Sequence, residues 1–92
     1  MIKSFANDAA ESLFDGQCPA FLQTTRRIAE RKLLQLHEAT SLESLRCPPG
    51  NRLELLKGDR EGQYSIRINR QYRVCFSWIE SDAHHVEIID YH

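Results

Sequence analysis

The chain has 92 residues, of which 41% are hydrophobic and 27% charged, and its formal net charge at pH 7 is −1. A chain of this length can bury one core, so we predict a single domain over residues 1–92. The sequence has no run of about 18 apolar residues, which excludes a transmembrane helix, and we expect no membrane partner. The first eight residues lack the apolar core of a signal peptide, and we therefore expect a cytoplasmic protein.

The cysteines are Cys18, Cys47 and Cys75, an odd number at wide spacing and without a Cys-x-x-Cys motif. This pattern indicates neither a disulfide framework nor a zinc site, so we expect reduced thiols. The sequence also contains no P-loop, nucleophile elbow or metal-ligand spacing. We therefore predict no metal ion and no cofactor.

The first half of the chain predicts one short strand followed by helices. Residues 2–5 are a strand candidate, and Asn7 can cap a first helix that ends at Gly16. A period of 3.6 residues predicts a second helix over residues 24–39. Its core stripe is predicted to consist of Ile28, Ala29, Leu33, Leu36 and Ala39.

The second half predicts strands. A capping-box pattern starts a last short helix over residues 40–45, and strands are predicted at residues 51–56, 63–68, 71–79 and 85–91 from alternating apolar side chains. The fold class is therefore α+β, with the helices on one face of a mainly antiparallel sheet. Because the helices are used on that face, we expect the other face to be partly open.

The register of the two central strands decides which side chains share the open face. A two-residue turn would mix charged and apolar side chains on both faces, whereas a three-residue loop at 69–71 pairs Arg67 with Arg73 and keeps the apolar residues together. Ser65 then lies on the same face as both arginines. Two like charges directly opposite repel each other unless an anion lies between them, so this register predicts an anion site.

Charge is segregated along the chain. Residues 1–23 carry a net charge of −2, residues 24–73 carry eleven Lys and Arg against six Asp and Glu, and residues 74–92 carry four acids and no Lys or Arg. A basic middle between acidic ends favours a local polyanion site over a uniformly basic surface. A mixed solvated surface gives the same distribution by chance.

The basic side chains Lys57, Arg67 and Arg73 are candidates for a phosphate clamp, since fixed cations stabilise the charge that grows on a phosphorus under attack. A solvated sheet face is the alternative for the same pattern. Glu54 lies on the clamp face and can act as a general base or pair with Arg67 or Arg73.

The chain ends in Asp90, Tyr91 and His92. An imidazole titrates near neutrality and can exchange a proton with an attacking or leaving oxygen, while Asp90 could orient it and Tyr91 could stack on a base. A frayed terminus is the alternative. Alternation leaves open whether Asp90 or Tyr91 faces the clamp.

Taken together, these segments resemble the HigB branch of the RelE superfamily of bacterial toxins, over the full length and in order. The segments that carry the resemblance are Ile2-Lys3-Ser4-Phe5, Asn51-Arg52-Leu53-Glu54, Leu56-Lys57-Gly58-Asp59-Arg60-Glu61-Gly62, Ser65-Ile66-Arg67, Tyr72-Arg73-Val74-Cys75-Phe76 and Asp90-Tyr91-His92. The resemblance implies a RelE-like fold and a toxin of a type II toxin-antitoxin module.

The resemblance also implies an activity. Such toxins are metal-independent endoribonucleases that cut translated mRNA in the ribosomal A site, where the ribose 2′-hydroxyl attacks the adjacent phosphate. Arg73 matches the family's sheet arginine, Lys57 matches a basic residue, and residues 90–92 match the C-terminal catalytic group. Relatives of this branch can carry a histidine where this chain has Glu54. If that histidine acts as the general base, the resemblance implies that Glu54 or His92 takes its place in this chain.

The implied partners are a HigA-type helix-turn-helix antitoxin, the 30S A site with its mRNA, and operator DNA through the antitoxin alone. We expect RNA contacts from Ser65, Arg60, Arg67 and Arg70. The alternative is a module of the same fold that binds the ribosome or an antitoxin without cutting RNA.

Overall fold

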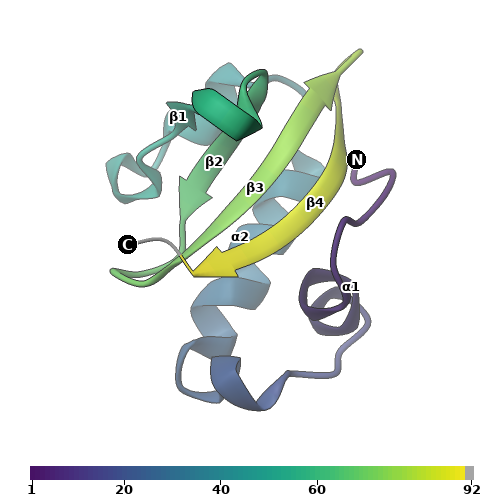
Figure 1. Ribbon diagram of the computed structural model, residues 1–92, viewed down its shortest axis with the longest axis vertical. Helices are drawn as coiled ribbons and strands as arrows, with labels where there is room; N and C mark the ends of the chain where they lie inside the picture. Colours follow the sequence, from purple (N-terminus) through teal and green to yellow (C-terminus); the bar gives the residue numbers. More distant parts are fainter. Residues whose placement is uncertain (91–92) are drawn as a thin grey trace.

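The computed structural model describes residues 1–90 of the 92-residue chain. Its two α-helices pack against a four-stranded antiparallel sheet with the strand order β1-β2-β3-β4 (Figure 1), which confirms the predicted α+β class. The elements are α1 (Asp8–Phe14), α2 (Arg26–Glu38), β1 (Glu54–Leu55), β2 (Gln63–Arg67), β3 (Tyr72–Ile79) and β4 (Asp82–Asp90).

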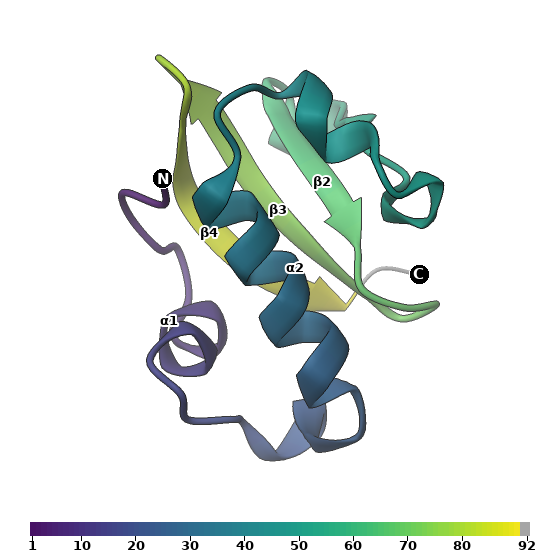
Figure 2. The same ribbon diagram turned by 180° about the vertical axis from the view of Figure 1, so that it is seen from behind.

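Both helices lie on one side of the sheet, and α2 runs diagonally across it (Figure 2). The opposite side of the sheet, here called the front face, is turned toward the viewer in Figure 1. A short 3-10 turn, Gly58–Arg60, lies over part of the front face and contacts β4 through the ion pair between Arg60 and Glu87.

The core lies between the helices and the back of the sheet. Phe76 is completely buried, as are Leu33 and Leu36 of α2, and full burial of such a side chain contributes about 1.5–3 kcal/mol. The central strands pair as predicted, with Ile66 opposite Val74. The buried core residues are Ala10, Leu13, Leu22, Ala29, Leu33, Leu36, Ala39, Leu45, Ile66, Ile68, Val74, Phe76, Ala83, Val86 and Ile88.

The loop between β2 and β3 fixes this register. Asn69 Oδ1 accepts hydrogen bonds from the backbone N–H groups of Gln71 and Tyr72, both at 2.8 Å. The Ile68 N–H donates to the Tyr72 carbonyl at 2.9 Å. An Asn side chain that mimics a backbone turn in this way sets the loop length, and Arg67 therefore faces Arg73 as predicted.

The predicted strand at residues 2–5 is wrong in extent, because this segment forms only two isolated parallel bridges, at Ile2 and Phe5. Between its partners on β4 lies an irregularity, where His85 has φ 55° and the β3–β4 register shifts. A bulge interrupts the regular ladder, so the backbone of the N-terminal segment bonds to Ala83 and Val86 on either side of it, while Ser4 Oγ accepts from the His85 N–H at 2.9 Å.

The predicted strand at 51–56 is also shorter than expected, and only Glu54–Leu55 pairs with β2. Before it, Pro49–Asn51 forms a 3-10 turn that ends at Arg52, which has the left-handed φ of 46°. A left-handed residue cannot continue a strand. The predicted short helix at 40–45 is likewise a 3-10 turn, Glu43–Arg46.

Two other boundaries differ. The predicted helix at 24–39 begins at Arg26, because residues 20–25 form a 3-10 turn. One member of its predicted stripe, Ile28, is 39% exposed since it lies at the first turn, beside that connection. The last strand begins at Asp82, three residues before the predicted His85.

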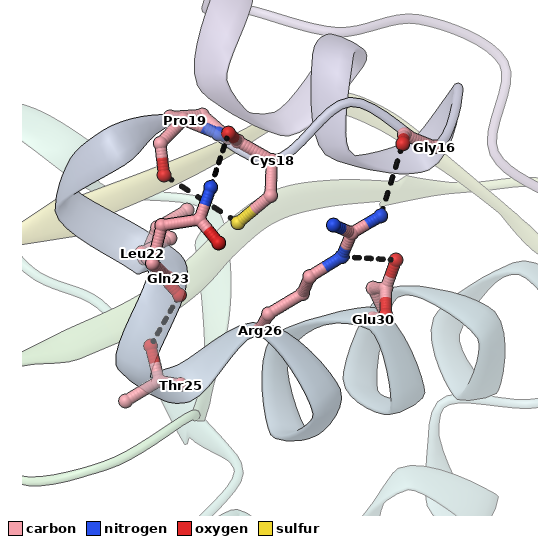
Figure 3. Close-up of polar contacts among 8 residues, drawn as sticks. All are labelled: Gly16, Cys18, Pro19, Leu22, Gln23, Thr25, Arg26 and Glu30. Atoms are coloured by element: carbon pink, nitrogen blue, oxygen red, sulfur yellow. Dashed lines mark hydrogen bonds and ion pairs between the residues drawn. The ribbon is translucent and has the colours of Figure 1, made fainter.

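Arg26 ties the connection between the helices to α2 (Figure 3). Its Nη2 donates to the Gly16 carbonyl at 3.0 Å, and its Nε donates to the Glu30 carboxylate at 3.2 Å. Gln23 Nε2 donates to the Cys18 carbonyl at 3.2 Å. These contacts hold the connection against the start of the helix.

Across residues 1–90, every helix is too short or too polar to cross a bilayer.

Asn7 caps α1 as predicted and also joins it to the sheet. Its Oδ1 accepts from the Ala10 N–H at 3.1 Å, and its Nδ2 donates to the Ile88 carbonyl at 2.9 Å.

We predict that Asn7→Ala lowers the free energy of unfolding by about 1–2 kcal/mol in urea denaturation, since an N-cap is lost. Asn7→Asp keeps the cap acceptor but loses the donor, so its loss should be smaller. Equal stability of Asn7→Ala and the wild type would contradict this role.

Candidate active site

The front face of the central strands carries a polar cluster. The β2–β3 ladder pairs Ser65 with Cys75 and Arg67 with Arg73, which places these four side chains on the same face. The predicted shared face of Ser65, Arg67 and Arg73 is therefore confirmed.

Arg73 is held on several sides by oxygen atoms. Its Nε donates to Ser65 Oγ at 2.8 Å, and its Nη2 donates to the Arg52 carbonyl at 2.7 Å. Its Nη1 lies 3.8 Å from the Glu54 carboxylate, whose side chain is 48% exposed. A buried guanidinium needs such acceptors, because leaving its donors unpaired would cost several kcal/mol.

The front face is open only in part, as predicted, and the expectation that Arg73 and Ser65 lie on its open part is wrong. Arg73 is 5% exposed and Ser65 is completely buried. The segment that leads into β1 covers them, because the left-handed turn at Arg52 directs its carbonyl to the guanidinium. The exposed part of the face lies at its margins, where Glu54, Lys57 and Arg70 are exposed.

The two opposed arginines avoid repulsion through different protein acceptors. Arg67 Nε donates to the Asn69 carbonyl at 3.0 Å, away from the acceptors of Arg73. Arg67 is partly exposed, whereas Arg73 is buried. The pair therefore needs no anion between its members to be stable, and the argument from like-charge repulsion does not by itself establish an anion site.

A cleft of about 390 Å³ lies beside Arg73 and collects three of the predicted residues, Glu54, Lys57 and Arg60. Leu55, Leu56 and Ile89 provide its apolar lining. Ile89 pairs with Arg73 across the β3–β4 ladder, so the cleft adjoins the arginine cluster. Because Glu54 belongs to β1 and Ile89 to β4, at opposite edges of the sheet, the cleft extends across the front face and brings two cations and a carboxylate to it.

Arg60 is engaged by a protein carboxylate. It forms a hydrogen-bonded ion pair with Glu87 and also donates to Gln63 Oε1 at 3.3 Å. The hydrogen bond to Glu87 raises the pKa of Arg60 above its ordinary value, against the opposing effect of burial. Arg60 is therefore a fixed cation whose charge is locally compensated.

The C-terminal candidates are separated in the ladder. Asp90 pairs with Tyr72, while its neighbour Ile89 pairs with Arg73. Alternation therefore places Asp90 on the side of Tyr72, across the sheet from Arg73, and its carboxylate accepts from Gln71 Nε2 at 3.1 Å. Tyr91 and His92 lie outside the described residues.

Sequence reasoning missed the Arg52 carbonyl and the Glu87 carboxylate. No signal marks Arg52, because the left-handed region favours glycine and asparagine over arginine. Glu87 would follow from extending the register to β4, where it faces Cys75. The bulge at His85 changes the alternation before that point, and bulges are not visible in the pattern of side chains. Within residues 1–90, no group of three His, Cys, Asp or Glu side chains is arranged to hold a metal ion.

The fold and the cluster define a class of protein. The chain resembles the YoeB–YefM complex from Staphylococcus aureus with a TM-score of 0.58 and 19% identity, covering 100% of this chain and 98% of that chain. It resembles the YoeB/ParE toxin from Agrobacterium tumefaciens with a TM-score of 0.53 and 20% identity, over 98% and 100% of the two chains. These likenesses show a RelE-like toxin fold.

The sequence comparisons identify the family. The profile described as "RelE-like toxin of type II toxin-antitoxin system HigB" matches residues 3–92, and the chain belongs to this family. It is 36% identical over 96 residues to the Endoribonuclease HigB of Proteus vulgaris, with all of both chains covered. It is 49% identical over 53 residues to Toxin HigB-1 of Vibrio cholerae, which covers 58% of this chain and 56% of that protein.

Cys75 is the buried thiol of the cluster, with no exposed surface. Burial raises its pKa to about 11, partly offset by the nearby Arg60. Because the thiolate is the reactive form, we predict that iodoacetamide at pH 8 modifies the exposed Cys47 and leaves Cys75 unmodified, as measured by peptide mass spectrometry. Denaturant should make Cys75 reactive. Native modification of Cys75 at the rate of Cys47 would contradict its burial.

Proposed function

We propose that this toxin is a metal-independent endoribonuclease that cuts translated mRNA in the ribosomal A site. The observation that carries the proposal is the guanidinium of Arg73, fixed by Ser65 and the Arg52 carbonyl, with the Glu54 carboxylate 3.8 Å away. Family membership and the name of the full-length Proteus relative support an activity on RNA.

The proposed reaction needs no bound metal. The 2′-oxygen of a ribose forms a bond to the adjacent phosphorus while the bond to the 5′-oxygen breaks, which leaves a 2′,3′-cyclic phosphate and a free 5′-hydroxyl. Negative charge grows on the phosphoryl oxygens, and cations fixed beforehand stabilise that charge. Arg73 and Lys57 are the proposed cations, and Lys57 is exposed at the adjoining cleft.

Two proton transfers complete the reaction. One group takes the proton of the 2′-hydroxyl, and another gives a proton to the 5′-oxygen as it leaves. We propose Glu54 and His92 for these two roles, and we propose that Tyr91 stacks on a base of the RNA. Asp90 lies across the sheet from Arg73, so its proposed role is to orient the C-terminal residues.

The ribosome explains how so few groups could suffice. Holding an attacking oxygen in line with its phosphorus contributes several kcal/mol, and the mRNA in the A site is already held. Because Arg73 is 5% exposed, RNA must first displace a covering group. Glu54 is the proposed one, since its side chain is 48% exposed and its ion pair to Arg73 is long at 3.8 Å.

The burial of Arg73 also favours the second candidate, a toxin that occupies the ribosome without cutting RNA. In that case the guanidinium stays in its protein contacts, and growth stops while the message remains intact. Mapping of mRNA ends during growth arrest distinguishes the two functions.

The proposed partners follow from the family. The Staphylococcus structures are toxin-antitoxin complexes, and we propose that this chain pairs with a HigA-type helix-turn-helix antitoxin that carries the contact with operator DNA. We place the complex in the cytoplasm, where ribosomes are found. The proposed RNA contacts are Ser65, Arg60, Arg67 and Arg70, of which Ser65 is buried and would act through Arg73.

Arg73→Lys tests the role of the guanidinium while keeping the charge. A lysine cannot reproduce the hydrogen bonds to both Ser65 and Arg52, and we predict that cleavage of a ribosome-bound message, followed by primer extension, slows about 100-fold. The matched control is Arg27→Lys, the same change at an exposed arginine of α2, which should cleave at the wild-type rate. Equal rates in both variants would remove Arg73 from the proposed site.

Loss of the C-terminal side chains forms a separate prediction. A chain ending at Asp90 should bind the ribosome but lose cleavage by about 100-fold or more, because one proton transfer is no longer catalysed. Primer extension measures the cuts, and co-sedimentation with ribosomes measures binding. Undiminished cleavage would leave Glu54 as the proposed base and remove His92.

A further inference from the structure

The carbonyl that receives Arg73 belongs to a strained residue. The backbone of Arg52 has φ 46° and ψ 55°, a left-handed conformation that residues other than glycine rarely adopt. Such a conformation persists where surrounding contacts over-determine it. Since the Arg73 Nη2 lies 2.7 Å from this carbonyl, whatever holds Arg52 also holds the guanidinium.

The preceding residue, Asn51, makes those contacts. It is completely buried, and its Nδ2 donates to the carbonyls of Leu45 and Cys47 at 3.1 and 3.3 Å. The backbone adds two bonds, from Asn51 N–H to the Pro48 carbonyl at 2.9 Å and from Arg52 N–H to the Pro49 carbonyl at 3.1 Å. The peptide between Asn51 and Arg52 is therefore fixed from both ends.

Two side chains of α2 hold Asn51 from the opposite side of the sheet. Lys32 Nζ donates to Asn51 Oδ1, and Gln35 Oε1 accepts from Asn51 Nδ2 at 3.0 Å. Gln35 also donates to the Cys47 carbonyl at 2.6 Å. Burial lowers the pKa of Lys32, with a smaller effect of Arg31 in the same direction, so this ammonium group is partly removed from water.

We propose that Asn51 is a positioning residue for Arg73, and that it links α2 to the front face through the Arg52 carbonyl. The chain of contacts runs from Lys32 to Asn51, through one peptide bond to Arg52, and then to the guanidinium. The segment that carries it connects α2 to β1 along the β2 side of the sheet (Figure 2). The role in cleavage rests on the proposed function of Arg73.

Asn51→Asp is the sharpest test because it preserves size and the acceptor for Lys32. It replaces the amide donor by an oxygen that faces three other oxygen atoms, from Gln35, Leu45 and Cys47. The peptide must then shift, and the bond from Arg73 to the Arg52 carbonyl is lengthened or lost.

The first measurement uses the free toxin and needs no RNA. The Arg73 Nε–H, buried against Ser65, should give a protected signal in a ¹H–¹⁵N correlation spectrum, assigned by its loss in Arg73→Lys. In Asn51→Asp this signal should shift and exchange with solvent about tenfold faster or more. Leu13→Ala, in α1 and outside the chain of contacts, is the control for lost stability. Each variant is measured at the same interval below its own Tm, and Leu13→Ala should leave the Arg73 signal in place.

The second measurement is single-turnover cleavage on programmed ribosomes. Asn51→Asp should lower the maximal rate about tenfold, with a change of less than about twofold in the concentration for half-saturation, because a misplaced group affects the reacting geometry more than binding. Lys32→Met should lower the maximal cleavage rate by a smaller factor. Lys32→Arg keeps a cationic donor at this position and should cleave at close to the wild-type rate. This pair also replaces Asn51→Asp if that variant does not fold.

The outcomes separate the two ideas. An unchanged Arg73 signal in Asn51→Asp, or an equal loss in Leu13→Ala, would show that Asn51 serves stability alone and would overturn the proposal. Absence of cleavage by the wild type would overturn the proposed function, while the Arg73 signal would still decide whether Asn51 positions this side chain.

Discussion

The contact between the Arg73 guanidinium and the oxygens of Ser65 and Arg52 is the constraint on which the front face depends. A cation at 5% exposure is tolerated only because its donors meet acceptors at 2.7 and 2.8 Å. Ser65 is supplied by the neighbouring strand and Arg52 by the segment before β1. Burial of the arginine therefore requires both the sheet register and the turn at Arg52.

This constraint explains why the two faces of one sheet differ so strongly. The back face is apolar and packs against α2, with Phe76, Val74 and Ile66 completely buried. The front face buries the polar side chains of Ser65 and Arg73 and the thiol of Cys75, and the 3-10 turn at Gly58–Arg60 lies nearby (Figure 1). Burying polar groups adds little net stability and raises the demand for accurate geometry. Such an arrangement suits a site in which a charged group must be held in one orientation.

The proposed activity gives this geometry a use. A toxin that relies on the ribosome to align its RNA needs few groups of its own, provided that those groups are already in place. The cleft lined by Glu54, Lys57 and Arg60 provides access at the margin of the buried cluster. The ion pair with Glu87 fixes Arg60 as a second cation at this cleft, and the Glu87 carboxylate compensates the charge of Arg60.

The sequence by itself determined the α+β class, the pairing of Arg67 with Arg73 and the cap at Asn7, because alternation, the 3.6-residue period and local turn chemistry are properties of neighbouring residues. The family followed from segments such as Tyr72-Arg73-Val74-Cys75-Phe76. Only the tertiary structure decided that Arg73 is buried, that Asp90 lies across the sheet from it, and that Arg52 is left-handed. Each of these depends on contacts between residues distant along the chain, such as Asn51 with Lys32 and Arg52 with Arg73, which no local pattern encodes.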